Sequence, residues 1–187
     1  MELAPESILV RHLQSFFGGH SIDEVTWPHG PIESVLPGFK VYRVAPGPKI
    51  NLWTYVSCGA SRVQHPNSGR LEFALLTESD APRCAELVTM TAHYHFTRGL
   101  GIGHTLPIGE PWFGSSLCTA LLISAPYPHG PEFEICQLPG EHLHICWILP
   151  ITEAERTFKI AHGVEALESL FEQRQLKYWE PNRSSVA

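Results

Sequence analysis

Two apolar runs on either side of a Pro-Gly turn constrain the fold of this chain more than any other feature. The runs cover 133–138 and 142–149, and Pro139-Gly140-Glu141 separates them. A short connection that contains glycine, between two runs of this length, is typical of a β-hairpin. The sequence therefore predicts a sheet with strong antiparallel character.

Four further strands are predicted from runs rich in β-branched and aromatic residues, which suit a pleated, half-buried surface. They cover 39–44, 51–57, 71–77 and 117–125, and a polar turn over 62–69 precedes the third. Within 71–77, Leu71 and Phe73 point to one face and Glu72 to the other, because successive side chains alternate along a strand. The prolines and glycines over 27–36 predict irregular structure there.

Two helices are predicted in the first half of the chain. Apolar residues at helical spacing indicate a helix over 5–17, and Gly18-Gly19 ends it. Ser79-Asp80 supplies a capping side chain just ahead of Pro82, where a proline costs nothing, so a second helix should run from there to about Arg98.

A capping box opens the helical C-terminal part. Thr152 is followed three residues later by Glu155, the pairing that satisfies two orphan N–H groups at a helix start. Gly163 bends or breaks this helix, helical spacing resumes over 164–171, and we expect a frayed tail after Tyr178. Strands and helices together predict an α+β fold with a mostly antiparallel or mixed sheet flanked by helices.

The size and composition fit one domain. The chain has 187 residues, of which 43% are hydrophobic and 17% charged, so it contains enough apolar material for a packed core. Single cores commonly serve chains up to about 250 residues, and no linker or internal repeat interrupts this one. We expect a single domain over 1–187.

The charge pattern narrows the class of partner. The net charge is −6 and Lys and Arg do not cluster, which argues against nucleic acid, where affinity comes from neutralising phosphates. A basic protein partner suits this charge better. The acidic N-terminus lacks the features of a secretory signal and no apolar stretch is long enough to span a membrane, so we expect a cytoplasmic protein that binds no membrane.

The five cysteines are an odd number, are widely spaced and form no C-x-x-C pair. This pattern predicts neither a disulfide framework nor a thiolate zinc site. We expect small buried hydrophobic side chains in a reducing compartment.

The histidines provide the main test for metal or cofactor chemistry. His142 and His144 share one face of a predicted strand and could ligate a metal jointly with His104 or a carboxylate; alternatively both imidazoles face solvent. Gly101-Ile102-Gly103 ahead of His104 lacks the spacing of a dinucleotide-binding loop. We therefore expect a protein without a metal, a cofactor or a catalytic residue. The alternative is a small metal-dependent or histidine-dependent hydrolase that uses these histidines and Glu72.

Glu72 is the carboxylate of greatest interest, because it lies on a predicted strand after a loop. We expect it on the polar, solvated side of the strand, and general acid/base catalysis would need a second group that the sequence does not place. It is kept as a candidate binding residue together with His104.

Two neighbouring aromatic residues are candidates for a protein-binding surface. Trp112 and Phe113 lie between Pro111 and Gly114 in a predicted loop, and large amphipathic rings anchor interfaces when they are exposed. Trp112 either contributes to such a surface or plugs the loop onto the core.

Four blocks of the sequence, in order and spacing, resemble the Suppressor-of-fused domain. They are Trp53–Ser61, Leu71–Thr77, Gly103–Leu106, and Ile148–Glu155 together with His162–Leu167. The resemblance covers about 51–171 and implies an α+β domain with a mixed or antiparallel sheet between helices.

The resemblance also implies a role in binding proteins. The similar animal protein regulates the Hedgehog pathway and holds a transcription factor through an extended peptide captured between this domain and a second one. The residues after Phe171 are too few to form that second domain, so no ligand-binding residue is transferred.

Short members of this kind look bacterial, and for them the resemblance implies an immunity protein that neutralises a toxin. We therefore predict a non-enzymatic protein-binding module, of immunity type or regulating by sequestration. A structural subunit of a larger assembly is a third possibility, and the oligomeric state stays open.

Overall fold

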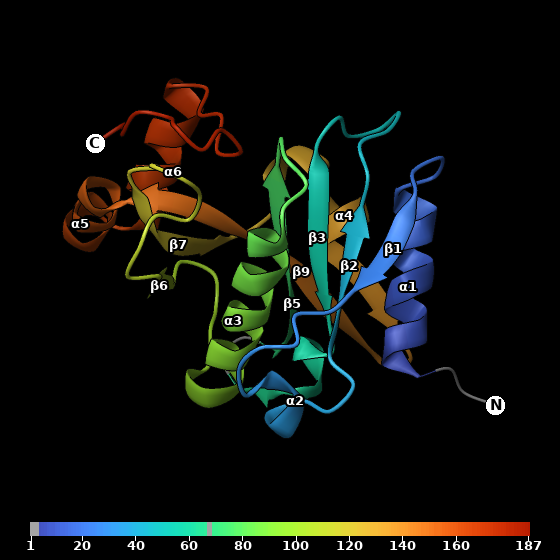
Figure 1. Cartoon of the computed structure of the whole chain (residues 1–187). Helices are drawn as coiled ribbons and strands as arrows, with labels where there is room; N and C mark the ends of the chain where they lie inside the picture. The colour runs from blue at the N-terminus through green and yellow to red at the C-terminus, as the bar shows by residue number, and fades with distance from the viewer. Residues whose placement is uncertain (1–3, 67–68) are drawn as a thin grey trace.

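A mixed β-sheet forms the centre of the molecule (Figure 1). The computed structural model describes residues 4–66 and 69–187, and within them the sheet has nine strands in the order β1-β2-β3-β5-β9-β7-β6, with β4 beside β5 and β8 beside β9. The strands are β1 (Ile22–Val25), β2 (Lys40–Val44), β3 (Trp53–Cys58), β4 (Gln64–His65), β5 (Gly69–Thr77), β6 (Thr105–Pro107), β7 (Cys118–Ser124), β8 (Ile135–Leu138) and β9 (Glu141–Thr152).

One pairing makes the sheet mixed. β5 and β9 run parallel, with Leu71 beside His144 and Glu72 beside Ile145, whereas the other described pairs are antiparallel. The long segment between β5 and β9 supplies the crossover that parallel strands need. The predicted hairpin is confirmed as the antiparallel pair β8–β9, closed between Leu138 and Glu141.

Helices cover both faces of the sheet. They are α1 (Pro5–Phe16), α2 (Ile32–Val35), α3 (Pro82–Arg98), α4 (Pro131–Glu134), α5 (Glu153–His162) and α6 (Val164–Gln173), with 3₁₀ turns η1 (Ala60–Arg62) and η2 (Tyr127–His129). Residues of α1 and α6 pack in the core on one face, and residues of α2 and α3 in the core on the other. Figure 1 shows α3 in front of the sheet and α4 behind it. The α+β fold with a mixed sheet flanked by helices is confirmed.

Coverage of both faces corrects the expected position of Glu72. Residues 71–77 are all buried, with Ala74 and Leu76 in one core and Phe73 and Leu75 in the other. A strand packed on both sides has no solvated face. Glu72 is therefore 0% exposed, and the expectation of a solvated carboxylate is wrong.

Several local predictions are confirmed. The helix over 5–17 appears as α1, and the Thr152–Glu155 capping box is complete at the start of α5. Gly163 separates α5 from α6 with a φ of 91°, a backbone conformation that favours glycine. The five cysteines are buried thiols, as predicted.

Other local predictions need correction. α3 begins without a side-chain cap, because Asp80 instead accepts hydrogen bonds from the Tyr55 hydroxyl and from Arg43. The strands β1 and β6 and the short helices α2 and α4 were not predicted, and residues 133–134 of the strand expected over 133–138 belong to α4. Of the polar turn expected over 62–69, β4 occupies 64–65, and positions 67 and 68 lie outside the described residues.

The C-terminal tail is packed, which corrects the frayed tail expected after Tyr178. Arg183 is 6% exposed and donates to both carboxylate oxygens of Glu155, at 2.7 Å from Nη1 and 2.6 Å from Nη2. The Val186 N–H also donates to Glu155, at 3.0 Å. The capping-box carboxylate therefore also holds the tail.

The described helices include none that is both long enough and apolar enough to cross a bilayer.

Candidate functional site

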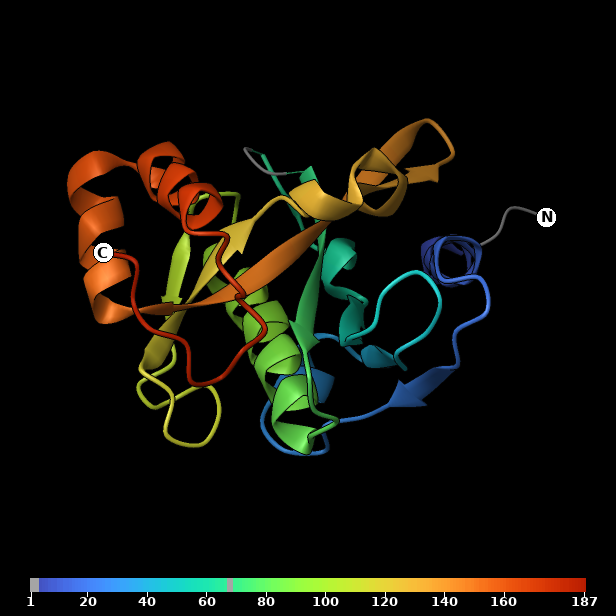
Figure 2. The same cartoon turned by 90° about the horizontal axis from the view of Figure 1, so that it is seen from above.

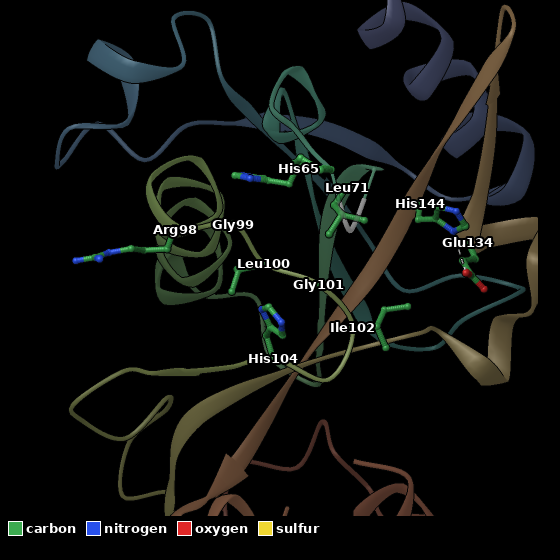
Figure 3. A pocket seen from close by; sticks show the side chains of 11 residues that line it. His65, Leu71, Arg98, Gly99, Leu100, Gly101, Ile102, His104, Glu134 and His144 are labelled. Atoms are coloured by element: carbon green, nitrogen blue, oxygen red, sulfur yellow. Dashed lines mark hydrogen bonds and ion pairs between the residues drawn. The ribbon is translucent and has the colours of Figure 1, made fainter. Parts of the chain in front are cut away.

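A pocket opens where the end of α3 approaches β5 and β9 (Figure 3). Its volume is about 530 Å³. Imidazoles, a guanidinium and apolar side chains share its walls, with one carboxylate at the edge. The lining residues are His65, Pro66, Leu71, Arg98, Gly99, Leu100, Gly101, Ile102, His104, Glu134 and His144.

Strand pairing and one tight turn build the pocket walls. Leu71 and His144 are direct partners in the parallel pair β5–β9, so their side chains share a face of the sheet. Gly99 ends α3 with a φ of 71°, and a Cβ there would lie 2.9 Å from the His65 ring. Only glycine fits this position without displacing His65, which explains the glycine at the turn.

His104 is fixed by the backbone on both sides. Its N–H donates to the Gly101 carbonyl at 3.0 Å, and its carbonyl accepts from the Ile123 N–H of β7 at 2.9 Å. The loop after α3 is thus hydrogen-bonded to strand β7 of the sheet. The glycines ahead of His104 therefore lie in a turn that connects α3 to the sheet.

The buried His95 packs against His65, a lining residue of the pocket. His95 is 0% exposed, and its Nδ1 accepts the Leu100 N–H at 2.9 Å, which places the ring proton on Nε2. Burial, with a smaller contribution from His65, lowers the pKa of His95 to about 4. His95 therefore stays neutral near pH 7, and its carbonyl accepts from His65 at 2.9 Å.

The histidines of the pocket do not assemble a metal site. His144 Nδ1 lies 3.0 Å from a Glu134 carboxylate oxygen, whereas Figure 3 shows His104 on the opposite side of the pocket. Across the part of the chain that the structure describes, no three His, Cys, Asp or Glu side chains lie close enough to hold one ion. His142 is exposed and does not line the pocket, so the joint site of His104, His142 and His144 is not formed.

Glu72 lies on the opposite face of the sheet from these histidines. Its neighbour Leu71 lines the pocket beside His144, and alternation along β5 turns Glu72 toward the face that α1 covers. The carboxylate is enclosed by a cluster that we call the Glu72 knot. It accepts hydrogen bonds from Ser57 Oγ (2.5 Å), Gly59 N (2.9 Å), Ala60 N (3.3 Å), Ser61 N (3.0 Å) and Ser61 Oγ (2.7 Å).

The Glu72 knot is structural in character. Burial raises the pKa of the Glu72 carboxyl, and the hydrogen bonds from Ser57, Ser61 and Gly59 oppose that rise. The Ser57 hydroxyl also accepts the Phe73 N–H at 2.8 Å, so the knot ties β3, η1 and β5 together. All of its members lie in the first two sequence blocks, Trp53–Ser61 and Leu71–Thr77.

Trp112 is a core residue, so of the two alternatives for this loop the structure shows the plug onto the core and not an exposed binding surface. Its side chain is 0% exposed and packs in the core on the α3 face, and its backbone N–H donates to the Cys118 carbonyl at 2.9 Å. Phe113 is half-buried, with its ring 5.8 Å from that of Trp112. The aromatic pair thus plugs the loop onto the core.

Sequence reasoning missed a second depression, which we call the acidic groove. It lies between α6, the tail and the segment after β7, and its volume is about 660 Å³. The available signal in the sequence is the spacing of three glutamates, Glu165, Glu168 and Glu172, along α6, beside the apolar positions of the same helix. The groove is lined by Ser124, Ala125, Tyr127, Pro128, Trp147, Leu149, Glu165, Glu168, Ser169, Phe171, Glu172, Gln175, Leu176 and Tyr178.

Comparison with known proteins gave concordant results. The model of the family described as Suppressor of fused protein (SUFU) matches residues 36–184. The crystal structure of a SUFU homolog from Neisseria gonorrhoeae FA 1090 is 33% identical, with a TM-score of 0.85, and the match covers 97% of this chain and 96% of that one. A search of curated protein sequences gave no match.

Two more distant structures share the fold. The match to a chain of the Sufu–Fu complex has 15% identity and a TM-score of 0.73, and it covers 100% of this chain and 93% of that one. Drosophila Suppressor of Fused has 16% identity and a TM-score of 0.68, with 95% of this chain and 50% of that one covered.

Proposed function

This chain belongs to the Suppressor of fused protein (SUFU) family, and we propose that it acts as one protein-binding domain that neutralises a partner toxin by direct binding, as immunity proteins do. The family is one of protein–protein interaction, as the Sufu–Fu complex illustrates. Regulation of a partner by sequestration uses the same physical step. The 33% identical homolog from Neisseria gonorrhoeae supports the choice of a bacterial system.

The observation that favours binding over hydrolysis is the separation of Glu72 from the histidine pocket. A hydrolase that used His104, His144 and Glu72 would need them on one side of the sheet, within hydrogen-bond reach of one substrate. Glu72 instead lies on the other face, where five donors enclose it. Its lone pairs are already used within the fold.

The charge of the chain supports a basic partner. A net charge of −6 raises the encounter rate with a positively charged protein, because complementary fields steer association. The proposal places the protein in the cytoplasm, where five buried free thiols remain reduced.

Co-expression with the product of the adjacent gene tests the proposal. We expect the chain to restore growth of cells that produce that product, and the two proteins to co-elute as a stable complex in size-exclusion chromatography. Absence of both protection and a complex would count against the immunity role. Stoichiometric metal in the purified protein, lost in His144→Ala, would instead favour the hydrolase.

A further inference from the structure

The acidic groove combines an apolar floor with a negatively charged wall. Trp147, Leu149, Phe171, Leu176 and Tyr178 contribute apolar or aromatic surface, and no Lys, Arg or His is among its described lining residues. Figure 2 shows α6 and the tail at the opposite end of the molecule from α1. The groove is also distinct from the histidine pocket, because the two share no lining residue.

The charged wall is a row of three carboxylates on α6. Glu165, Glu168 and Glu172 follow one another at spacings of three and four residues, so they project from one side of the helix. Glu168 accepts hydrogen bonds from the hydroxyls of Ser124 (2.6 Å) and Tyr127 (3.5 Å), which are neutral. Among the described residues no ion pair involves any of the three. Their charge is therefore uncompensated within the fold.

Trp147 forms part of the groove floor and carries a buried donor that is unpaired among the described residues. The residue lines the groove, is 2% exposed, and its indole N–H has no hydrogen-bond acceptor within the described part of the chain. Buried indole N–H groups normally have a partner, because an unpaired buried donor costs free energy. Tyr178 (ring centroids 4.7 Å apart) and His129 (5.1 Å) hold the ring in place, so the donor position is fixed.

We propose that the acidic groove is the surface that receives a basic amphipathic segment of the partner protein. Lysine or arginine side chains of that segment pair with Glu165, Glu168 and Glu172, and its apolar side chains fill the floor, which includes Trp147. This inference rests on the proposed protein-binding function and assigns it a surface. An acidic or neutral segment leaves the three carboxylates unpaired, and a second copy of this chain also carries a net charge of −6.

Peptide binding tests the assignment directly. The probe is a fluorescein-labelled synthetic peptide that interleaves lysine and arginine with leucine and phenylalanine, with matched peptides in which glutamine or glutamate replaces every basic residue. We expect fluorescence anisotropy to show binding of the basic peptide alone, weakened by salt. The Trp147 indole N–H signal should shift in ¹H–¹⁵N NMR spectra as this peptide is added.

Charge-neutralised variants locate the binding site. Glu165→Gln, Glu168→Gln and Glu172→Gln combined should weaken binding at least ~5-fold, since each partly exposed ion pair contributes modestly. The double variant that leaves Glu168 unchanged alters only exposed side chains without hydrogen bonds, so it should fold normally and show an intermediate loss. The matched control neutralises Glu24, Glu110 and Glu153, which lie outside the groove and change the net charge equally.

Three outcomes would overturn the groove assignment. The first is that the three peptides bind equally well, and the second is that the control variant weakens binding as much as the groove variant does. The third is that the groove substitutions change only the self-association of the chain, measured by sedimentation, and leave peptide binding unchanged. Co-expression separates this failure from failure of the proposed function. If the triple groove variant protects cells as well as the unaltered chain does, the surface is wrong and the function stands; if the unaltered chain protects against nothing, the function is wrong.

Discussion

Replacing Arg183 with methionine removes one partner of a fully buried ion pair. The two side chains are 4% and 0% exposed, and the guanidinium donates to both oxygens of Glu155 and to the carbonyls of Pro150 (2.8 Å) and Ser184 (3.0 Å). Methionine fills much of the same volume. The variant therefore isolates the loss of the charge and of these hydrogen bonds.

The expected cost follows from the carboxylate that stays behind. Glu155 keeps hydrogen bonds from the N–H groups of Thr152 (2.9 Å) and Val186 (3.0 Å) but loses its counter-charge. Removing one partner of a buried pair typically costs about 3–5 kcal/mol. A chain of this size loses roughly 2–4 °C of Tm per kcal/mol, so we expect a fall of about 6–20 °C.

Calorimetry and peptide binding together test this reasoning. Arg174→Met is the matched control, because Arg174 is exposed and no described ion pair includes it. The acidic groove is lined in part by Gln175, Leu176 and Tyr178, which precede Arg183 in the tail. Because Arg183→Met releases the tail, it should also weaken binding of the basic peptide. A Tm no lower than that of the control would refute the structural role of the pair.

Three further perturbations have defined outcomes. Glu72→Gln should destabilise the fold by about 1–3 kcal/mol in urea unfolding, because the amide leaves a donor of the Glu72 knot unpaired. Glu78→Gln is the control, because Glu78 is exposed and its replacement should not change stability. Equal stabilities of the two variants would contradict the structural role of the Glu72 knot. Trp112→Ala should cost about 3–5 kcal/mol and leave partner affinity intact below the lowered Tm, and unchanged stability with lost binding would place the ring at an interface. Burial lowers the pKa of His129 from 6.5 to about 4. The unfolded chain therefore binds a proton at this residue more readily than the folded chain, so the contribution of His129 to the free energy of unfolding is complete above pH 6.5 and is lost as the pH falls toward 4. Between pH 6.5 and pH 5 the free energy of unfolding should therefore fall by about 1 kcal/mol less in His129→Phe than in the unaltered chain, as urea unfolding at the two pH values would measure. Equal falls in the two proteins would show that His129 does not titrate this way.

Features encoded by a few adjacent residues were predictable from the sequence. The turn at Pro139-Gly140, the capping box at Thr152 and the helix break at Gly163 all lie where their local patterns indicate. Each depends on hydrogen bonds and backbone angles within one turn of the chain. The same local signals, together with the ordered blocks, identified the fold class and the family.

Features that depend on segments far apart in the sequence were decided by the tertiary structure. Glu72 sits one residue from Leu71, but only the pairing of β5 with β9 separates it from His144 by a sheet. Arg183 looked like part of a frayed tail because its partner lies 28 positions earlier in the chain. A single sequence carries the identities of such groups and not their register or packing, and it is register and packing that turn a glutamate into a buried anchor and a tail into the wall of a groove.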